Sequence, residues 1–260
     1  IWSWDGRAWS RAGTLPAPRY GGGLASDGEH LVLTCGGDRR KQIERDLWIL
    51  DPDVAGPIDI AWRKSSMEKG PAGRSRPGFV HAPDRRVFFL VAGTARAGVL
   101  GDLWQWAERD GWRRLSTDLP RRHGAAVAYD TQRGRLVVFG GGDGDDALDD
   151  LWTWRDEATG WESGPRGPPG RSEASMVFDG ERCLLFGGRV GARGEDRSSN
   201  DLWVLDEEGW HELHLDPAPP ARCFAAFVWD PERRVAVLHG GAADAGGREA
   251  LLNDVWELHP

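Results

Sequence analysis

The chain has 260 residues, of which 28% are charged and 40% hydrophobic, with 36 glycines, 16 prolines and 15 tryptophans. This length fits one large domain or two small ones, and the sequence contains no run of about 18 apolar residues that would predict a membrane-spanning helix. The formal net charge of −8 argues against a protein that binds the phosphate backbone of a nucleic acid.

The chain begins with Ile rather than Met, and nothing near this end resembles a signal peptide, so we expect a segment of a longer polypeptide. The three cysteines, Cys35, Cys183 and Cys223, are too few for a disulfide framework. Each lies in an apolar, strand-like run. We therefore expect free buried thiols, a reducing compartment and a cytoplasmic protein.

A pattern recurs five times after residue 13. Each repeat begins with an arginine, continues into an apolar run that ends on a small doublet, and then carries Asp-Leu-Trp, or Asp-Val-Trp in the last repeat, at spacings of 48 to 56 residues. Such self-similarity is typical of repeat architectures. We place the repeats approximately at 14–66, 67–117, 118–165, 166–215 and 216–260 within one domain, 1–260.

Each repeat is predicted to contain four short strands, which we call a to d. Strand a follows the arginine and has small residues at its start, such as Gly22-Gly23 and Ala125-Ala126. Strand b is continuously apolar, as in Leu136–Phe139, which is typical of a strand covered on both faces. Strand c carries Leu-Trp, and strand d carries another tryptophan, as at Trp62 and Trp112. Turn signals such as Asp-Gly join strands a and b.

Repeated four-stranded antiparallel sheets without an amphipathic helix predict an all-β protein and, more specifically, a β-propeller. Strand a would line the central channel, and the small doublets would form the b-to-c turn. The order of Arg, Gly-Gly, Asp-Leu-Trp and a fourth-strand Trp resembles the kelch family over nearly all of the chain. Two departures are Ala92, which replaces the first glycine in the second repeat, and tryptophan where the family's third strand often has tyrosine.

The ends of the chain suggest how the ring closes. Residues 1–13 contain c-like and d-like segments, Ile1–Trp4 and the stretch around Trp9, whereas no d strand follows Trp256. We expect five blades, with the strand around Trp9 completing the last blade, because the resemblance implies closure by strands from both termini. A six-bladed or incomplete ring is the alternative. Five blades leave one c-like segment surplus, and six need an a–b pair that the sequence lacks.

The kelch resemblance, and in particular that to adaptor subunits of ubiquitin ligases, implies ligand binding on the face where the d-to-a and b-to-c loops open. The repeated arginines would gather there, and guanidinium groups pair bidentately with carboxylates. We therefore predict a protein-interaction module for another protein or an acidic peptide, with no catalytic residue, metal or cofactor. Its predicted ligand-binding residues are Arg19, Arg39, Arg40, Arg74, Arg76, Arg122, His123, Arg171, Glu173 and Arg222. Alternatively, the repeated arginine is structural and bonds backbone carbonyls or the neighbouring blade.

The b-to-c loops differ between repeats, and specificity is expected where repeats differ. Loop 38–45 is rich in positive charge and loop 142–149 in negative charge, so opposite sides of the rim would orient a dipolar partner. Ordinary solvated loops are the simpler explanation. No metal site is predicted, because the acidic loop lacks the spacing of an EF-hand, and His211 and His214 would face opposite sides of a strand.

Two further functions stay open. A small enzyme acting on an anionic sugar at the channel mouth would use His123 and Glu173 for acid–base chemistry, since they lie on neighbouring repeats and could approach each other, with Arg74 or Arg122 beside them. Copper-oxidase chemistry is not predicted, because the two tyrosines have no matching set of ligands. A structural or oligomer-forming domain is the third possibility.

Overall fold

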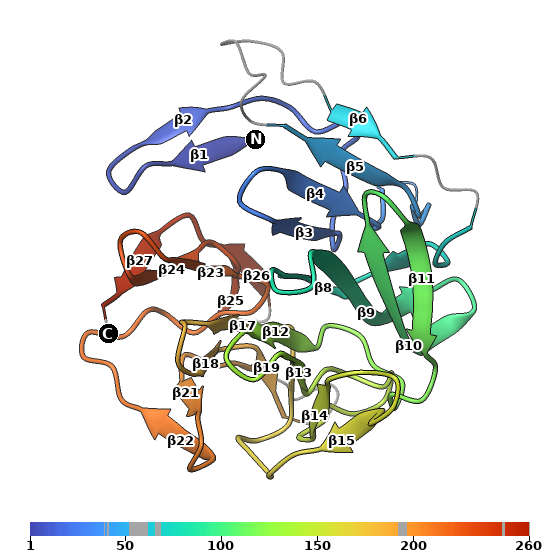
Figure 1. The fold of residues 1–260 in the computed structure, drawn as a ribbon. Helices are drawn as coiled ribbons and strands as arrows, with labels where there is room; N and C mark the ends of the chain where they lie inside the picture. The colour runs from blue at the N-terminus through green and yellow to red at the C-terminus, as the bar shows by residue number, and fades with distance from the viewer. Residues whose placement is uncertain are drawn as a thin grey trace.

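The computed structural model describes residues 1–38, 40, 42–51, 62–65, 69–191, 197–245 and 248–259. Every regular element in these ranges is a β-strand, and the sheets follow one another around a ring (Figure 1). None of the described segments is a helix long and apolar enough to cross a membrane. The predicted all-β fold is confirmed, and its sheets have the form of kelch propeller blades.

The predicted order of strands a to d is found in the sheets, which we call blades 1 to 5. Blade 1 contains β3 (Gly23–Ser26), β4 (Leu31–Thr34), β5 (Leu47–Leu50) and β6 (Trp62–Lys64). Blade 2 contains β8 (Gly78–Ala82), β9 (Val87–Ala95), β10 (Gly98–Ala107) and β11 (Gly111–Ser116). Blade 3 contains β12 (Ala126–Asp130), β13 (Arg135–Phe139), β14 (Leu151–Trp154) and β15 (Trp161–Ser163). Blade 4 contains β17 (Ser175–Phe178), β18 (Cys183–Phe186), β21 (Leu202–Leu205) and β22 (Trp210–Leu213), and blade 5 contains β23 (Ala226–Asp230), β24 (Val235–His239) and β27 (Val255–Leu258).

Short strands outside the blades shape the b-to-c loops. In blade 2, β7 (Arg74–Ser75) pairs with the extended end of β9. In blade 4, β16 (Arg171–Ser172), β19 (Arg189–Val190) and β20 (Arg197–Ser198) form a small sheet, and in blade 5, β25 (Ala242–Ala245) and β26 (Arg248–Leu251) form a hairpin. The described parts of these loops therefore form short strands that extend from the blades, which the sequence did not predict.

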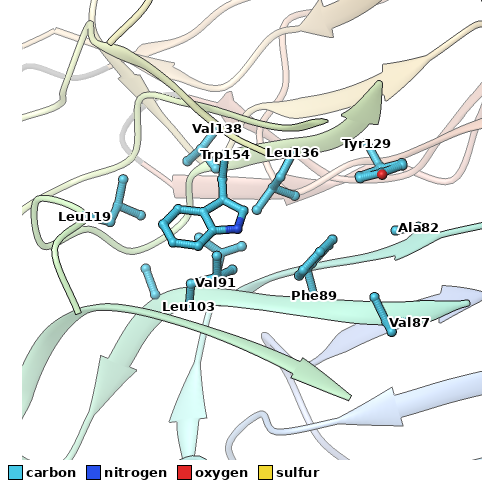
Figure 2. Packing of buried hydrophobic residues seen from close by; sticks show 11 residues of the cluster. Ala82, Val87, Phe89, Val91, Leu103, Leu119, Tyr129, Leu136, Val138 and Trp154 are labelled. Carbon is cyan, nitrogen blue, oxygen red and sulfur yellow. The ribbon is translucent and has the colours of Figure 1, made fainter. Parts of the chain in front are cut away.

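The hydrophobic core lies between neighbouring blades. Figure 2 shows Trp154, from strand c of blade 3, packed near Leu103 and Val91 of blade 2 and Leu119 from the loop that joins the two blades. Strand b is covered on both faces as predicted, since every residue of Leu136–Phe139 is 0% exposed. Burying a large aromatic side chain stabilises a fold by about 2–3 kcal/mol. Inter-blade packing explains the two buried tryptophans, Trp106 and Trp154, and those that pack against the same clusters, which are Trp112, Trp152, Trp161, Trp203, Trp210, Trp229 and Trp256. The three cysteines are free and buried, as expected, and burial raises the pKa of the Cys183 thiol to about 12.

The small doublet occupies two successive left-handed backbone positions. In blade 3, Gly140 has φ 61° and Gly141 has φ 99°. The first position also accepts other residues, because Ala92 has φ 52° there in blade 2. In blade 1 the pair is Cys35 and Gly36, at φ 63° and 94°, although the Gly-Gly doublet in the sequence lies one residue later, at Gly36-Gly37. Only the second position requires glycine, since φ near +100° is strained for any residue with a Cβ.

The amino-terminal strands do not complete blade 5, so this part of the predicted closure is wrong. Strand β2 (Trp9–Arg11) pairs with β1 (Trp2–Trp4) in a separate two-stranded sheet, and no described strand pairs with the outer edge of β27. The reason is local. The Asp5 carboxylate accepts hydrogen bonds from the N–H groups of Arg7 and Ala8, both at 2.8 Å, and this turn holds the two strands together as a hairpin.

The β1–β2 hairpin lies against blade 5 as the outer half of another blade would. The Trp9 ring on β2 lies 4.5 Å from the His239 ring at the end of strand b in blade 5. In the same way, the Trp210 ring on strand d of blade 4 lies 5.0 Å from Phe139 at the end of strand b in blade 3. The hairpin thus takes the place of strands c and d between blades 5 and 1 (Figure 1). The number of blades stays a prediction.

Candidate binding site at the channel mouth

The repeated arginines are bound inside their own blades. Arg122 donates from Nη1 and Nη2 to the two carboxylate oxygens of Asp150, at 2.7 and 2.9 Å. It also donates from Nη1 to the Gly140 carbonyl and from Nε to the Pro120 carbonyl, both at 2.9 Å. The same bidentate pairs join Arg19 to Asp46, Arg74 to Asp102, Arg171 to Asp201 and Arg222 to Asp254.

The carboxylate also fixes the tryptophan of Asp-Leu-Trp. In blade 3 the Trp152 indole N–H donates to Asp150 Oδ2 at 2.6 Å, and the other four repeats make the same bond. The distant Arg and Asp-Leu-Trp motifs are therefore one hydrogen-bonded unit that ties strand c to the start of strand a. Arg74, Arg122, Arg171 and Arg222 are at most 1% exposed, and Arg19 has a side chain 3% exposed. Ligand binding by these five residues stays a prediction, and the geometry favours the structural alternative.

The ion pairs shift the titration of the aspartates. At Asp150, burial alone would raise the pKa, but the hydrogen bonds from Arg122 and Trp152 outweigh it and the pKa is lowered. At Asp254, the hydrogen bond from Arg222 is the largest influence, and the pKa falls to about 2. Because these carboxyl groups titrate at lower pH in the folded state than in the unfolded chain, their ionised form stabilises the fold.

We expect the melting temperature to fall as the pH drops from about 4, the ordinary value of an aspartate, towards the folded pKa of about 2. A carboxyl group whose pKa is lowered by folding stabilises the fold at pH values above its pKa in the unfolded chain. This stability is lost as the pH falls through its pKa in the folded protein. Calorimetry between pH 7 and 2 measures the melting temperature. Asp254→Asn should reduce its fall at acid pH, whereas Asp110→Asn, at an exposed residue, should not. An equal fall of the melting temperature at acid pH in wild type and Asp254→Asn would contradict a stabilising role for the ionised Asp254 carboxylate.

A belt of backbone hydrogen bonds surrounds the channel mouth. The residue two positions after each repeated arginine adopts a left-handed conformation with φ between 53° and 58°. From blade 2 to blade 5, each of these residues donates its N–H to the carbonyl of the equivalent residue in the preceding blade, at 2.7 to 3.0 Å. The residues in order are Gly21, Arg76, Gly124, Glu173 and Phe224. The belt therefore brings three unlike side chains to one mouth: the guanidinium of Arg76, the carboxylate of Glu173 and the phenyl ring of Phe224.

Three of the predicted residues meet at this mouth. Glu173, which is 8% exposed, accepts a hydrogen bond from Arg76 Nη1 at 2.9 Å. His123 Nδ1 lies 3.7 Å from the same carboxylate oxygen and, within the described part of the chain, is buried without a hydrogen-bond partner. Gly124 leaves room for this contact, because a Cβ there would collide with the Glu173 carboxylate. The expected approach of His123 and Glu173 is confirmed.

These residues line a cavity of about 380 Å³ beside the mouth. Its other walls include Ser172, Arg189 and the acidic b-to-c loop of blade 3, which contributes Asp145 and Asp146. Phe224 is 47% exposed at its edge, and the Arg189 guanidinium lies 5.8 Å from the Phe224 ring centre. Phe224 is not among the residues predicted from the sequence. Its signal was a large aromatic residue at a repeat position where the other blades have Gly, Arg, Gly and Glu.

The remaining predicted residues lie away from this cavity or outside the description. Arg40 is exposed on the b-to-c loop of blade 1, and its N–H donates to the Asp38 carboxylate at 2.9 Å. Arg39 lies outside the described residues. In the acidic loop, Asp143 accepts N–H bonds from Asp145 and Asp146 at 2.9 Å, and the described residues contain no cluster of metal-ligating side chains.

Comparison with known proteins identifies the repeat. The family described as the KLHDC2/KLHL20/DRC7 Kelch-repeats domain matches residues 107–260. The chain belongs to the kelch-repeat family. The kelch domain is 27% identical over 211 residues to putative adagio-like protein 2 of Oryza sativa subsp. japonica, covering 75% of this chain and 32% of that protein. It is 37% identical over 117 residues to host cell factor 2 of Homo sapiens, covering 42% of this chain and 14% of that protein.

A third relative is multiple epidermal growth factor-like domains protein 8 of Homo sapiens, 30% identical over 163 residues that cover 59% of the kelch domain and 5% of that protein. The chain thus spans 32% or less of the length of these relatives. Kelch-repeat domains are typically non-enzymatic and serve in protein interactions. The general class of the predicted function, a protein-interaction module, agrees with this membership.

Proposed function

We propose that this kelch domain binds a partner protein at the channel mouth, in the cavity beside Arg76, Glu173 and Phe224. The observation that supports this most is the exposed Phe224 ring, held in a left-handed backbone position next to the half-buried ion pair of Arg76 and Glu173. Aromatic and arginine side chains are the types most enriched where binding energy concentrates. A rigid platform of this kind limits the entropy that binding must overcome.

The chemistry of the cavity suggests the partner segment. Arg76 donates from Nη1 to Glu173, and its side chain remains 38% exposed, so further guanidinium donors are accessible to a carboxylate. An apolar side chain of the partner would pack on Phe224. Asp145 and Asp146 on the wall of blade 3 would repel an acidic group placed there. The proposed ligand is therefore a peptide segment with an acidic residue near Arg76 and an apolar residue at Phe224, oriented by the acidic wall.

The test is selection of binders from a displayed random-peptide library on the folded domain. Selected peptides are then measured by fluorescence anisotropy against Phe224→Gly and Arg76→Gly. Glycine suits both positions, because Gly21 and Gly124 adopt the same backbone conformation in two other blades. Each variant should weaken binding at least about tenfold, which corresponds to about 1.4 kcal/mol. The matched control is Arg113→Ala, an exposed arginine on strand d whose side chain pairs with Glu157 on the outside of the ring.

A set of peptides enriched in acidic and apolar residues, with binding lost in both mouth variants and kept in the control, would support the proposal. If both mouth variants bind the selected peptides as tightly as wild type does, the binding surface lies elsewhere and the proposal is rejected. So would a selection that yields no specific binder to the folded domain.

A second candidate function is suggested by the contact between His123 and Glu173 on the cavity wall. An enzyme acting on an anionic sugar would use this pair for proton transfer and Arg76 for the negative charge. The geometry supports it less well, because 3.7 Å exceeds a hydrogen bond and Arg76 already holds the carboxylate. Turnover of uronic acid or sugar phosphate substrates that disappears in His123→Ala would favour catalysis. Absence of turnover in wild type would remove this candidate.

A further inference from the structure

A second cavity, of about 430 Å³, opens between blades 1 and 2. Its walls include the a-to-b turns of the two blades, near residues 27–30 and 83–86, and the start of the c-to-d turn of blade 2 at Glu108. These turns lie at the strand ends opposite to the b-to-c and d-to-a loops that surround the channel mouth. The cavity shares no lining residue with the candidate binding site and is therefore a separate feature.

The equivalent space between blades 2 and 3 is filled by an arginine of the chain itself. Tyr129, on strand a of blade 3, donates from its hydroxyl to Asp84 Oδ2 and accepts from Arg85 Nε, both at 2.9 Å. The Arg85 guanidinium lies 5.9 Å from the centre of the Tyr129 ring and 6.0 Å from that of the Phe89 ring. A guanidinium thus fits between two blades at this level, where aromatic rings and hydrogen bonds hold it.

Smaller side chains leave the space between blades 1 and 2 open. His81 takes the place of Tyr129, because each lies on strand a, seven residues after a repeated arginine. On strand b of the preceding blade, Val32 takes the place of Phe89. Between blades 4 and 5, by contrast, the larger Trp229 stands at the position of His81 and packs against the core.

The a-to-b turn of blade 1 is also too short to fill the cavity. In blade 2 this turn contains four residues, 83–86, and Arg85 is one of them. In blade 1 only residues 28 and 29 lie between Asp27 and His30, whose carbonyl accepts the Asp27 N–H at 3.2 Å. This shorter turn contains no arginine, so blade 1 has no equivalent of Arg85.

The open cavity has an aromatic floor and an acidic rim. The buried rings of Phe88 and Trp106 line it, and the His81 ring lies 4.8 Å from that of Phe88. Three carboxylates and one guanidinium line it as well, from Asp27, Glu29, Glu108 and Arg86. Glu108 also pairs with the half-exposed Arg63, at 2.7 Å. The excess of carboxylates favours a cationic ligand, as does the net charge of −8 on the whole chain.

Two details keep this negative charge available. Burial lowers the pKa of His81 more than the nearby carboxylates raise it, so its ring adds no positive charge at neutral pH. In the equivalent short turn of blade 4, Asp179 pairs with the Arg182 guanidinium at 3.1 Å. In blade 1 the His30 ring stands in that place, 3.3 Å from Asp27. A guanidinium is always charged and an imidazole is not, so the blade 1 carboxylate is less neutralised.

We propose that this cavity binds an arginine side chain of a partner protein, on the face of the ring opposite the channel mouth. The guanidinium would lie over the aromatic floor, as that of Arg85 lies over Tyr129 and Phe89, and its free donors would pair with the acidic rim. Arginine is favoured over lysine because its planar group both stacks on rings and pairs bidentately with carboxylates. The site is independent of peptide binding at the mouth.

Titration with N-acetyl-arginine amide, followed by nuclear magnetic resonance of the Trp106 indole N–H, tests the proposal. N-acetyl-citrulline amide has nearly the same shape without the charge and is the matched control. We expect a saturable shift with the arginine probe, at a Kd of about 1 mM for so small a ligand, and binding at least about tenfold weaker for the citrulline probe. No saturable shift, or equal affinities for the two probes, would overturn the proposal.

Variants then locate the probe. His81→Tyr should abolish the shift, because blade 3 accommodates a tyrosine at this position and the ring would fill the cavity. Glu29→Gln should weaken binding at least about threefold, whereas Glu181→Gln, at the equivalent residue in the short turn of blade 4, should leave it unchanged. Phe224→Gly, at the mouth, should also leave it unchanged. Unchanged affinity in His81→Tyr, or loss in Phe224→Gly, would reject this cavity as the site.

The same arginine within a peptide, acetyl-Gly-Ser-Arg-Ser-Gly amide, tests whether a protein segment can reach the cavity. We expect it to bind at least as tightly as N-acetyl-arginine amide and to be equally sensitive to His81→Tyr. Clearly weaker binding of the peptide would show that the cavity admits a free cation but not a protein side chain, and would overturn the proposed partner.

Discussion

Replacing Arg122 with methionine is expected to lower the free energy of unfolding by about 3–5 kcal/mol, because the change removes a fully buried guanidinium that satisfies two carbonyls and the Asp150 carboxylate, whose side chain is 35% exposed. Methionine keeps most of the apolar stem but removes every donor. The Gly140 and Pro120 carbonyls and the Asp150 carboxylate then lose the bonds that satisfied them inside the blade. Trp152, which also donates to Asp150, would lose part of its positioning.

Urea denaturation followed by tryptophan fluorescence measures this loss. The matched control is Arg113→Met, because Arg113 is an arginine whose side chain is 56% exposed and whose ion pair with Glu157 lies in solvent. Such exposed pairs contribute about 0–1 kcal/mol. A loss below about 1 kcal/mol for Arg122→Met would show that the repeated arginine is not a structural residue and would return it to the candidates for ligand binding.

Replacing Gly141 with valine is expected to cost about 3 kcal/mol or more, since it combines backbone strain with a steric clash. Gly141 has φ 99°, and a Cβ there would lie 2.8 Å from the His123 carbonyl oxygen and 3.2 Å from the Ala125 Cα. Relief of the clash would move the Gly141 N–H away from the Arg171 carbonyl, to which it donates at 2.8 Å, and so weaken the contact between blades 3 and 4.

Thermal unfolding compares this variant with Gly160→Ala. Gly160 also has a positive φ, 68°, but a Cβ there would meet nothing within 4 Å, so we expect a cost of only about 1 kcal/mol. Similar losses in the two variants would show that strain alone, and not the close approach of strand a, explains the glycine at the second doublet position.

Much of the fold could be predicted because local sequence patterns specify where the strands and turns lie. The continuously apolar strand b, as in Leu136–Phe139, and the doublet before each Asp-Leu-Trp locate the strands without any knowledge of distant contacts. Even here, the sequence places the doublet of blade 1 one residue later than the structure does. Cys35 takes the left-handed position that the sequence pattern assigns to glycine. Conformation at one residue depends on the turn that contains it, and Cys at φ 63° is allowed although uncommon.

The candidate site was only partly predictable. His123 and Glu173 were expected to approach because their repeats are neighbours, and Arg76 stands at the same level of the ring. Phe224 was not recognised, because a single aromatic residue in a loop has the same local signal whether it is buried or exposed. Its exposure, 47%, accompanies the left-handed backbone position that it occupies in the belt.

By itself, the sequence determined the kelch repeat, the class of fold and the order of the strands, because the repeat imposes the same short-range pattern on every blade. Tertiary structure alone decided what the repeated arginines do. Arg122 meets Asp150 across 28 residues of chain, and only closure of the blade brings a guanidinium and a carboxylate together out of water. Tertiary structure also decided the place of the β1–β2 hairpin, since a strand's partner depends on which edges are near in space rather than on the strand's own residues.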